Sequence, residues 1–243
     1  MIRNLGQVLF FINLLQYNDN KAIIAANILG DIRAQVAVPD LINVAKSKFR
    51  KPEIRLAAIK NLGKIGDNRA VFPLMDILTS PNEIESLREQ AAISLGNIKD
   101  KSSIDSMLGL ICDKNVPENI RIKVIQALSN IKDKSCIGIL LNLLYDKSVN
   151  ISIASIKALL EIDQGKSKDI IEAIINRFED KNSDKTAQIN NYIADSIMNR
   201  KKVFEVLALI IQETKNEKLK TKAARIRSLI FQKYLEKQNI DLD

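Results

Sequence analysis

A short phrase recurs at a fixed interval, and this interval constrains the fold more than any other feature of the sequence. The phrase reads "NILGDIRA", "KNLGKIGD", "ISLGNIKD" and "QALSNIKD" in four successive copies. With Gly30, Gly63, Gly96 and Ser129 taken as anchor positions, each step is 33 residues long. A constant period of this length is typical of arrays built from small, repeated supersecondary units.

Around each anchor, the apolar residues follow a helical period. A small or apolar residue lies five positions before the anchor, a leucine lies directly before it, and an isoleucine follows two positions after it. These offsets predict a first helix, helix A, with one apolar face. A glycine inside such a helix costs about 1 kcal/mol relative to alanine. We therefore expect the anchor to be a close-packing point, where helix A folds back on its partner.

An aspartate follows each of the last three anchors by four residues, at Asp67, Asp100 and Asp133. Aspartate accepts hydrogen bonds from the free N–H groups at a helix start, so these residues are predicted to be caps. A catalytic row of carboxylates is the alternative interpretation. It is disfavoured because nothing nearby in the sequence could act as a partner acid or nucleophile.

A second apolar stripe begins eight residues after each anchor and predicts helix B, as in Val71, Leu74, Met75 and Leu78. The pattern continues with drift over residues 150–214. The sequence thus predicts an all-α, right-handed α-α superhelix of about six helix pairs. We expect one domain over 1–243, with a half-repeat at 1–19, the strongest repeats at 21–147, degenerate repeats at 150–214 and a capping helix at 216–239.

Composition and charge narrow the possible functions. The chain has no histidine, which removes the commonest general base and metal ligand. Its two cysteines favour a reducing, cytoplasmic location. The apolar run at Leu5–Leu15 is interrupted by polar residues and is too short to cross a bilayer. The net charge of +8 is concentrated at the two ends, with the basic C-terminal segment offering weak contacts to anionic groups.

The unit at residues 54–78 resembles the HEAT-like repeat of the phycobilin-lyase type. The resemblance is carried by an arginine, a pair of small residues, a Leu-Gly-x-Ile-Gly-Asp phrase and an Ala-Val pair, at Arg55, Ala57, Ala58, Leu62, Gly63, Ile65, Gly66, Asp67, Ala70 and Val71. It covers residues 21–147 and implies a solenoid fold. Because the same repeat serves scaffolds, lyases and regulators, it leaves the function open.

Arginines recur at the start of helix A with the same 33-residue period, at Arg55, Arg88 and Arg121. One interpretation is structural, namely a ladder that pairs with carboxylates or carbonyls between units. The other is a row of anion-binding sites. The exact recurrence favours the structural interpretation, because binding sites are rarely copied in every unit.

In a solenoid of this type, helix B lines the concave face, and its side chains opposite the buried stripe are candidates for a binding site. They are small, neutral or acidic residues with two aromatic neighbours: Asp40, Asn43, Phe72, Asp76, Ser106, Gly109, Ile139, Asn142, Tyr145 and Asn176. A nucleic-acid groove of this kind needs lysine and arginine instead.

These features predict a non-catalytic scaffold or adaptor that presents its concave groove to a protein partner. We expect no catalytic residues, no metal and no cofactor, since phosphate-binding loops and metal-spaced clusters are missing from the sequence. Two alternatives stay open. One is a subunit of a lyase-type or other protein-modifying enzyme, and the other is a nucleic-acid-associated repeat protein that uses its basic ends.

Overall fold

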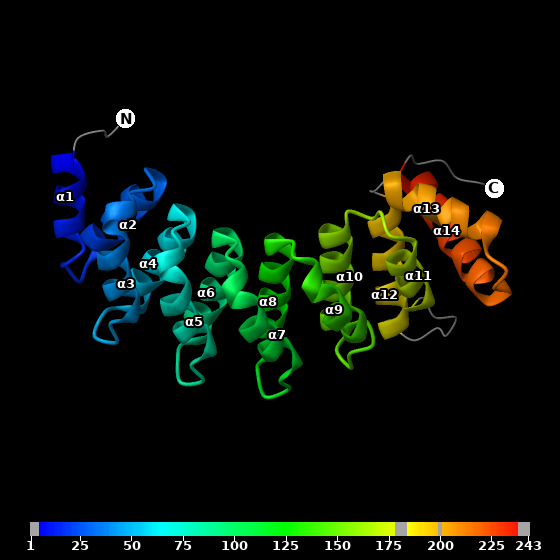
Figure 1. Cartoon of the computed structure of the whole chain (residues 1–243), viewed down its shortest axis with the longest axis horizontal. Helices are drawn as coiled ribbons and strands as arrows, with labels where there is room; N and C mark the ends of the chain where they lie inside the picture. Colours follow the sequence, from blue (N-terminus) through cyan, green and yellow to red (C-terminus); the bar gives the residue numbers. More distant parts are fainter. Residues whose placement is uncertain (1–4, 178–183, 199–200, 238–243) are drawn as a thin grey trace. The chain divides into compact units, whose positions relative to one another are not determined.

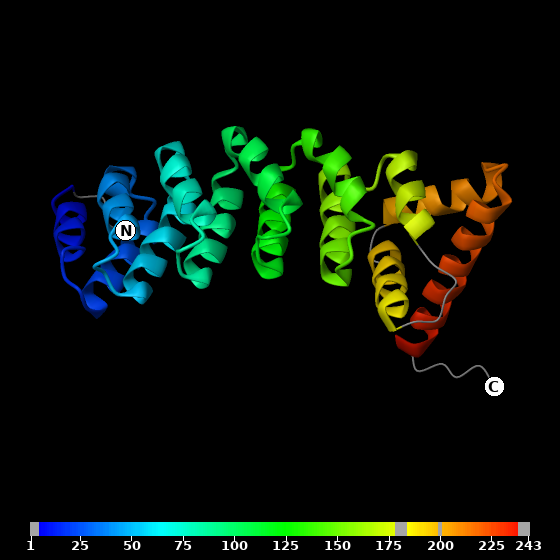
Figure 2. The same ribbon diagram turned by 90° about the horizontal axis from the view of Figure 1, so that it is seen from below.

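The computed structural model describes residues 5–177, 184–198 and 201–237, and every regular element in these ranges is helical. The chain divides into two compact units, with unit 1 ending at Asp133 and unit 2 beginning at Lys134. Each unit is a succession of helix pairs (Figures 1 and 2). The predicted all-α repeat fold is therefore confirmed, whereas a single domain over 1–243 stays a prediction.

Unit 1 begins with α1 (Leu5–Leu14) and continues with three complete pairs and one further helix. Helices of type A are α2 (Asn20–Asp31), α4 (Pro52–Ile65), α6 (Glu85–Ile98) and α8 (Glu118–Ile131). Helices of type B are α3 (Val38–Lys46), α5 (Val71–Thr79) and α7 (Ile104–Cys112). Successive A helices stack on one another, and each B helix packs against the A helix that follows it (Figure 1).

Unit 2 continues the alternation. Its A helices are α10 (Val149–Asp163), α12 (Asp184–Met198) and α14 (Glu217–Lys237), and its B helices are α9 (Ile137–Leu143), α11 (Lys168–Arg177) and α13 (Lys201–Glu213). The last helix, α14, packs on α11, α12 and α13. It matches the predicted capping helix, of which residues 238–239 lie outside the described residues.

Two features form the turns between A and B helices: a residue in the left-handed conformation and an aspartate that caps the following 3₁₀ turn. Helix α4 ends at Gly66 in the left-handed region with φ 76°, and Lys99 and Lys132 end α6 and α8 with φ 61° and 60°. A short 3₁₀ turn follows, and Asp67 and Asp100 accept hydrogen bonds from the backbone N–H of Arg69 and Ser102, at 2.9 and 2.8 Å. The predicted capping role of these two aspartates is confirmed.

The anchor glycines are close-packing points, but their partner differs from the one expected. A β-carbon added to Gly63 would lie 2.7 Å from Cα of Ser94, and one added to Gly96 would lie 2.7 Å from Cα of Ala127. At Gly30 it would overlap the side chain of Asn61. These contacts join consecutive A helices, so the expected fold-back onto helix B is wrong. The glycines instead set how closely the repeats stack.

Asn61 fills the space left by Gly30 and is fully buried between α2 and α4. Its Nδ2 donates to Oδ1 of Asn27 at 2.9 Å and to the carbonyl of Ala57 at 2.8 Å. Its Oδ1 is fully enclosed without a hydrogen-bond donor. At the next step, Ser94 Oγ donates to the carbonyl of Ile59 at 2.9 Å. Polar side chains thus link successive A helices, Asn61 through the side chain of Asn27 and Ser94 through a backbone carbonyl.

The periodic arginines cap the C-terminal ends of the B helices. Nε of Arg55, Arg88 and Arg121 donates to the carbonyl oxygens of Ala45, Leu78 and Ile111, at 2.8, 2.9 and 2.8 Å. All three arginine side chains are buried. Because the last carbonyls of a helix have no partner within it, each arginine satisfies the end of the preceding B helix. The structural interpretation of the arginine ladder is therefore confirmed.

Candidate protein-binding face

The candidate face in unit 1 consists of the exposed residues of α3, α5 and α7, and is called here the B-helix face. Each of these helices buries the predicted apolar stripe and leaves the opposite side chains outside, because one helical face packs on the A helices. Neighbouring helices α3 and α5 are in contact. An ion pair between Lys46 Nζ and Asp76 Oδ2, at 3.1 Å, joins them on the surface.

The structure places the predicted residues of unit 1 on this face, with different degrees of exposure. Asn43, Asp76, Ser106 and Gly109 are exposed, and Asp40 is half-buried. Phe72 is the most prominent of them, since 74% of its surface is accessible. Its neighbours along α5, Val71 and Leu74, belong to the core.

Five further exposed residues of the B-helix face were not among the predicted site residues: Pro39, Lys46, Thr79, Asp105 and Cys112. They lie at the same two repeat positions as Phe72 and Tyr145, 9 and 16 residues after the anchor. Phe49, in the loop after α3, is 96% exposed and was also missed. A helical wheel fixes the buried stripe well, but it leaves the edges of the exposed arc uncertain by one position. The loop residue has no periodic signal.

The predicted residues of unit 2 lie on α9, directly after α9, and in the last turn of α11. Asn142 and Asn176 are exposed and Ile139 is half-buried. Tyr145 lies just beyond α9 and is 62% exposed, although Arg177 Cζ lies 5.6 Å from its ring centroid. Nε of Arg177 also donates to the carbonyl of Leu144 at 2.7 Å. Arg177 thus caps the C-terminal end of α9, as the periodic arginines cap the B helices of unit 1.

The charge of the B-helix face differs from that of a nucleic-acid groove. Helices α3, α5 and α7 carry one lysine, Lys46, and three aspartates, Asp40, Asp76 and Asp105. The lysine is paired with Asp76. Phosphate neutralisation would need a row of lysines and arginines, which these helices lack.

The cap aspartates Asp67 and Asp100 are held in the ionised form by the groups that they cap. Hydrogen bonds from Arg69 lower the pKa of Asp67, with its side chain contributing most, and the hydroxyl and backbone N–H of Ser102 lower the pKa of Asp100. A carboxylate held ionised in this way is unsuited to act as a general acid. Within the described ranges, no group of His, Cys, Asp and Glu side chains could hold a metal ion.

A surface hollow of ≈ 430 Å³ lies elsewhere, at the C-terminal ends of the A helices, and is lined by Gly30, Asp31, Arg33, Gly63, Lys64 and Asn97. Lys64 and Asp31 form an ion pair of 2.7 Å in its wall. None of the predicted site residues lines it. Among the helices that the structure describes, none combines the length and hydrophobicity that a transmembrane span requires.

Comparison with solved structures shows the fold again. The chain is similar to a chain from the complex of CpcE and CpcF of phycocyanin lyase from Nostoc sp., with a TM-score of 0.55, 20% identity and coverage of 92% of this chain and 94% of that one. It is also similar to YibA of Escherichia coli, with a TM-score of 0.53, 16% identity and coverage of 92% and 82%. Among curated protein sequences, none matches significantly.

The family model for HEAT repeats matches residues 8–85 and 82–159. Together these matches cover more than half of the chain, and they include every anchor position and all three periodic arginines. The chain belongs to the HEAT repeat family.

Proposed function

We propose that the protein is a non-catalytic scaffold whose B-helix face binds a protein partner, with Phe72 as the apolar anchor. The observation that carries this proposal is the 74% exposure of Phe72 on a helix whose other apolar residues are largely in the core. A phenylalanine buries a large apolar area on binding, and aromatic side chains dominate the energy of many interfaces.

The surroundings of Phe72 suit a close approach by another protein. Asn43 on α3 and Ser106 and Gly109 on α7 are small and exposed. The Lys46–Asp76 pair offers polar groups about one helical turn from Phe72, because Asp76 follows Phe72 by four residues on α5. An apolar centre with a polar surround is the usual arrangement of a protein interface.

The residues of unit 2 form the second part of the proposal. Tyr145 presents a ring that is already oriented by Arg177, and Asn142, Asn176 and Ile139 complete this set. A ring fixed before binding loses little side-chain entropy on association. We propose that this set is a separate contact surface of unit 2 for a protein partner.

A lyase-type subunit is the second candidate function. It is favoured by the similarity to a chain of the phycocyanin lyase complex, which itself contains two kinds of chain. At 20% identity this similarity concerns the fold, so it supports a partner chain more than it supports a reaction. Retention of a bilin by the purified protein would favour this function over the scaffold.

Photo-crosslinking tests the proposed face. A benzoylphenylalanine at position 72 should crosslink a defined partner in native lysate. The same group at position 24 is the matched control, because Ile24 is an exposed apolar residue of α2 on an A helix. Equal crosslinking of the same protein from both positions would show that the B-helix face is not the binding site.

A further inference from the structure

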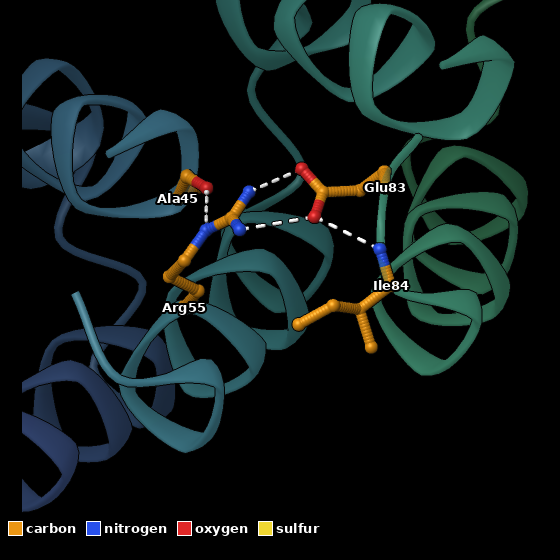
Figure 3. A network of polar contacts seen from close by, with 4 residues as sticks. All are labelled: Ala45, Arg55, Glu83 and Ile84. Atoms are coloured by element: carbon orange, nitrogen blue, oxygen red, sulfur yellow. Dashed lines mark hydrogen bonds and ion pairs between the residues drawn. The ribbon is translucent and has the colours of Figure 1, made fainter. Parts of the chain in front are cut away.

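The three periodic arginines are alike at Nε but not at the two Nη groups. In Arg55 these groups bind Glu83, with Nη1 at 3.0 Å from Oε1 and Nη2 at 2.5 Å from Oε2 (Figure 3). Glu83 lies in the loop before α6, 28 residues after Arg55. Each of the three guanidinium nitrogens of Arg55 therefore donates to a group of α3 or of the next inter-pair loop.

The equivalent carboxylate is missing at Arg88. The residue 28 positions later is Val116, which has no polar atom in its side chain. Nε of Arg88 is bound to the carbonyl of Leu78, but its Nη groups donate to no protein group in the described chain. The side chain is only 6% exposed, so its charge is largely withdrawn from water without a counter-ion.

The Nη groups of Arg88 are nevertheless not completely enclosed. Among described residues, the one fully enclosed polar side-chain atom without a partner is Oδ1 of Asn61. The unpaired Nη groups of Arg88 must therefore touch solvent. Since the bond from Nε fixes the plane of the guanidinium, its remaining donors form a rigid fork suited to a planar carboxylate.

We propose that the Nη fork of Arg88 binds the carboxylate of an acidic side chain of the partner, in the position that Glu83 takes at Arg55. This inference rests on the proposed function and specifies the chemistry of the partner. Arg88 is anchored to the last turn of α5, the same helix that carries Phe72 in its first turn. The partner thus places an apolar group on Phe72 and an aspartate or glutamate at Arg88.

A probe titration tests the fork without knowledge of the partner. N-acetyl-glutamate amide is added to the ¹⁵N-arginine-labelled protein, and the Nε–H signals are followed by nuclear magnetic resonance. We expect a saturable shift of the Arg88 signal and no comparable shift of Arg55, whose fork is filled by Glu83. An unmoved Arg88 signal, or an equal response to inorganic phosphate, would overturn the assignment to a carboxylate.

Two substitutions should reverse which of the two arginines has its Nη groups paired with a carboxylate of the chain. Val116→Glu should fill the fork of Arg88 and abolish its response, and Glu83→Val should open the fork of Arg55 and give it one. If Val116→Glu responds as the wild type does, the proposed geometry is wrong. Glu83→Val introduces a smaller side chain, so no larger group has to fit into the loop. The response of Arg55 in this variant therefore tests the proposal even if Val116→Glu folds poorly.

Binding of the purified partner separates this inference from the proposed function. Val116→Glu should weaken binding roughly tenfold, as the loss of a charge-assisted contact does. Normal binding by Val116→Glu with loss of binding by Phe72→Ala would overturn the carboxylate inference and leave the proposed function intact. Normal binding by Phe72→Ala would overturn the proposed function, whatever the probe titration shows.

Discussion

Arg55 and Glu83 form a two-pronged ion pair that joins α4 to the loop before α6, with both side chains at least nine-tenths buried. The same carboxylate accepts a hydrogen bond from the backbone N–H of Ile84, at 3.0 Å (Figure 3). The side-chain hydrogen bonds from Arg55 are the main cause that lowers the pKa of Glu83. The pair therefore links stability to pH.

Glu83→Gln should destabilise the protein by about 1–3 kcal/mol at pH 7, because a hydrogen-bonded charge is lost. A carboxyl group whose pKa is lowered by folding stabilises the folded state above its ordinary value of about 4.3. This contribution disappears as the pH falls through the lowered value. Urea unfolding of wild type and Glu83→Gln should thus converge in acid. The exposed Glu53→Gln serves as control, and a constant difference at all pH values would contradict this account.

Gly30→Ala should destabilise the stacking of α2 on α4 by about 1–3 kcal/mol, since the new methyl group meets the buried side chain of Asn61. The cost should be smaller in an Asn61→Ala background, because the nearest clashing atoms are then gone. At Gly63 the clash includes the backbone of Ser94, so Ser94→Ala should give no such relief. Double-mutant cycles from thermal unfolding measure both couplings, and equal couplings would count against the stacking geometry.

Lys99→Gly should stabilise the protein by about 1 kcal/mol. The left-handed conformation at the end of α6 costs a non-glycine residue about this much free energy. Gly66 already occupies the equivalent position of α4. Lys60→Gly is the matched control and should destabilise by about 1 kcal/mol, since it lies within α4. Stabilisation by neither or by both would show that the turn geometry is not the cause. Chemical denaturation gives both values.

The two cysteines should differ strongly in reactivity. Cys112 is an exposed thiol at the end of α7, whereas Cys136 is fully buried. A thiol reagent added to the folded protein should therefore modify Cys112 at once and Cys136 only on unfolding. Cys112→Ser should remove the fast phase, and a fast phase that survives this substitution would place Cys136 at the surface.

The 33-residue period predicts helix order, the buried stripes, the aspartate caps and the arginine ladder, because each depends on residues within one repeat or at a fixed offset. It does not predict which helix meets Gly30 or which residue pairs with Arg55. Asn61 and Glu83 lie 31 and 28 residues away, and their positions depend on how adjacent repeats stack. The candidate face was predicted as a set of rows, but Lys46 and Cys112 lie at the edge of the exposed arc, which a helical wheel does not fix to within one position.

The drift of the repeat in unit 2 hides one further contact. The carbonyl of Leu144 is at the same repeat position as Ala45, Leu78 and Ile111, yet its donor is Arg177 of α11. Position 154, where the period would place the arginine, is Ala154. In every case an arginine donates a hydrogen bond to the carbonyl at the end of the B helix, but in unit 2 this arginine comes from a different position of the repeat.

The most direct test of the proposed function is the affinity of the crosslinked and purified partner for Phe72→Ala and Ile24→Ala, measured by calorimetry. Both variants lose one exposed apolar side chain, and both should keep the wild-type circular dichroism. We predict that Phe72→Ala weakens binding by about tenfold or more, as expected for a central aromatic contact, and that Ile24→Ala leaves it unchanged. Wild-type affinity in Phe72→Ala would contradict the assignment of the B-helix face as the partner site.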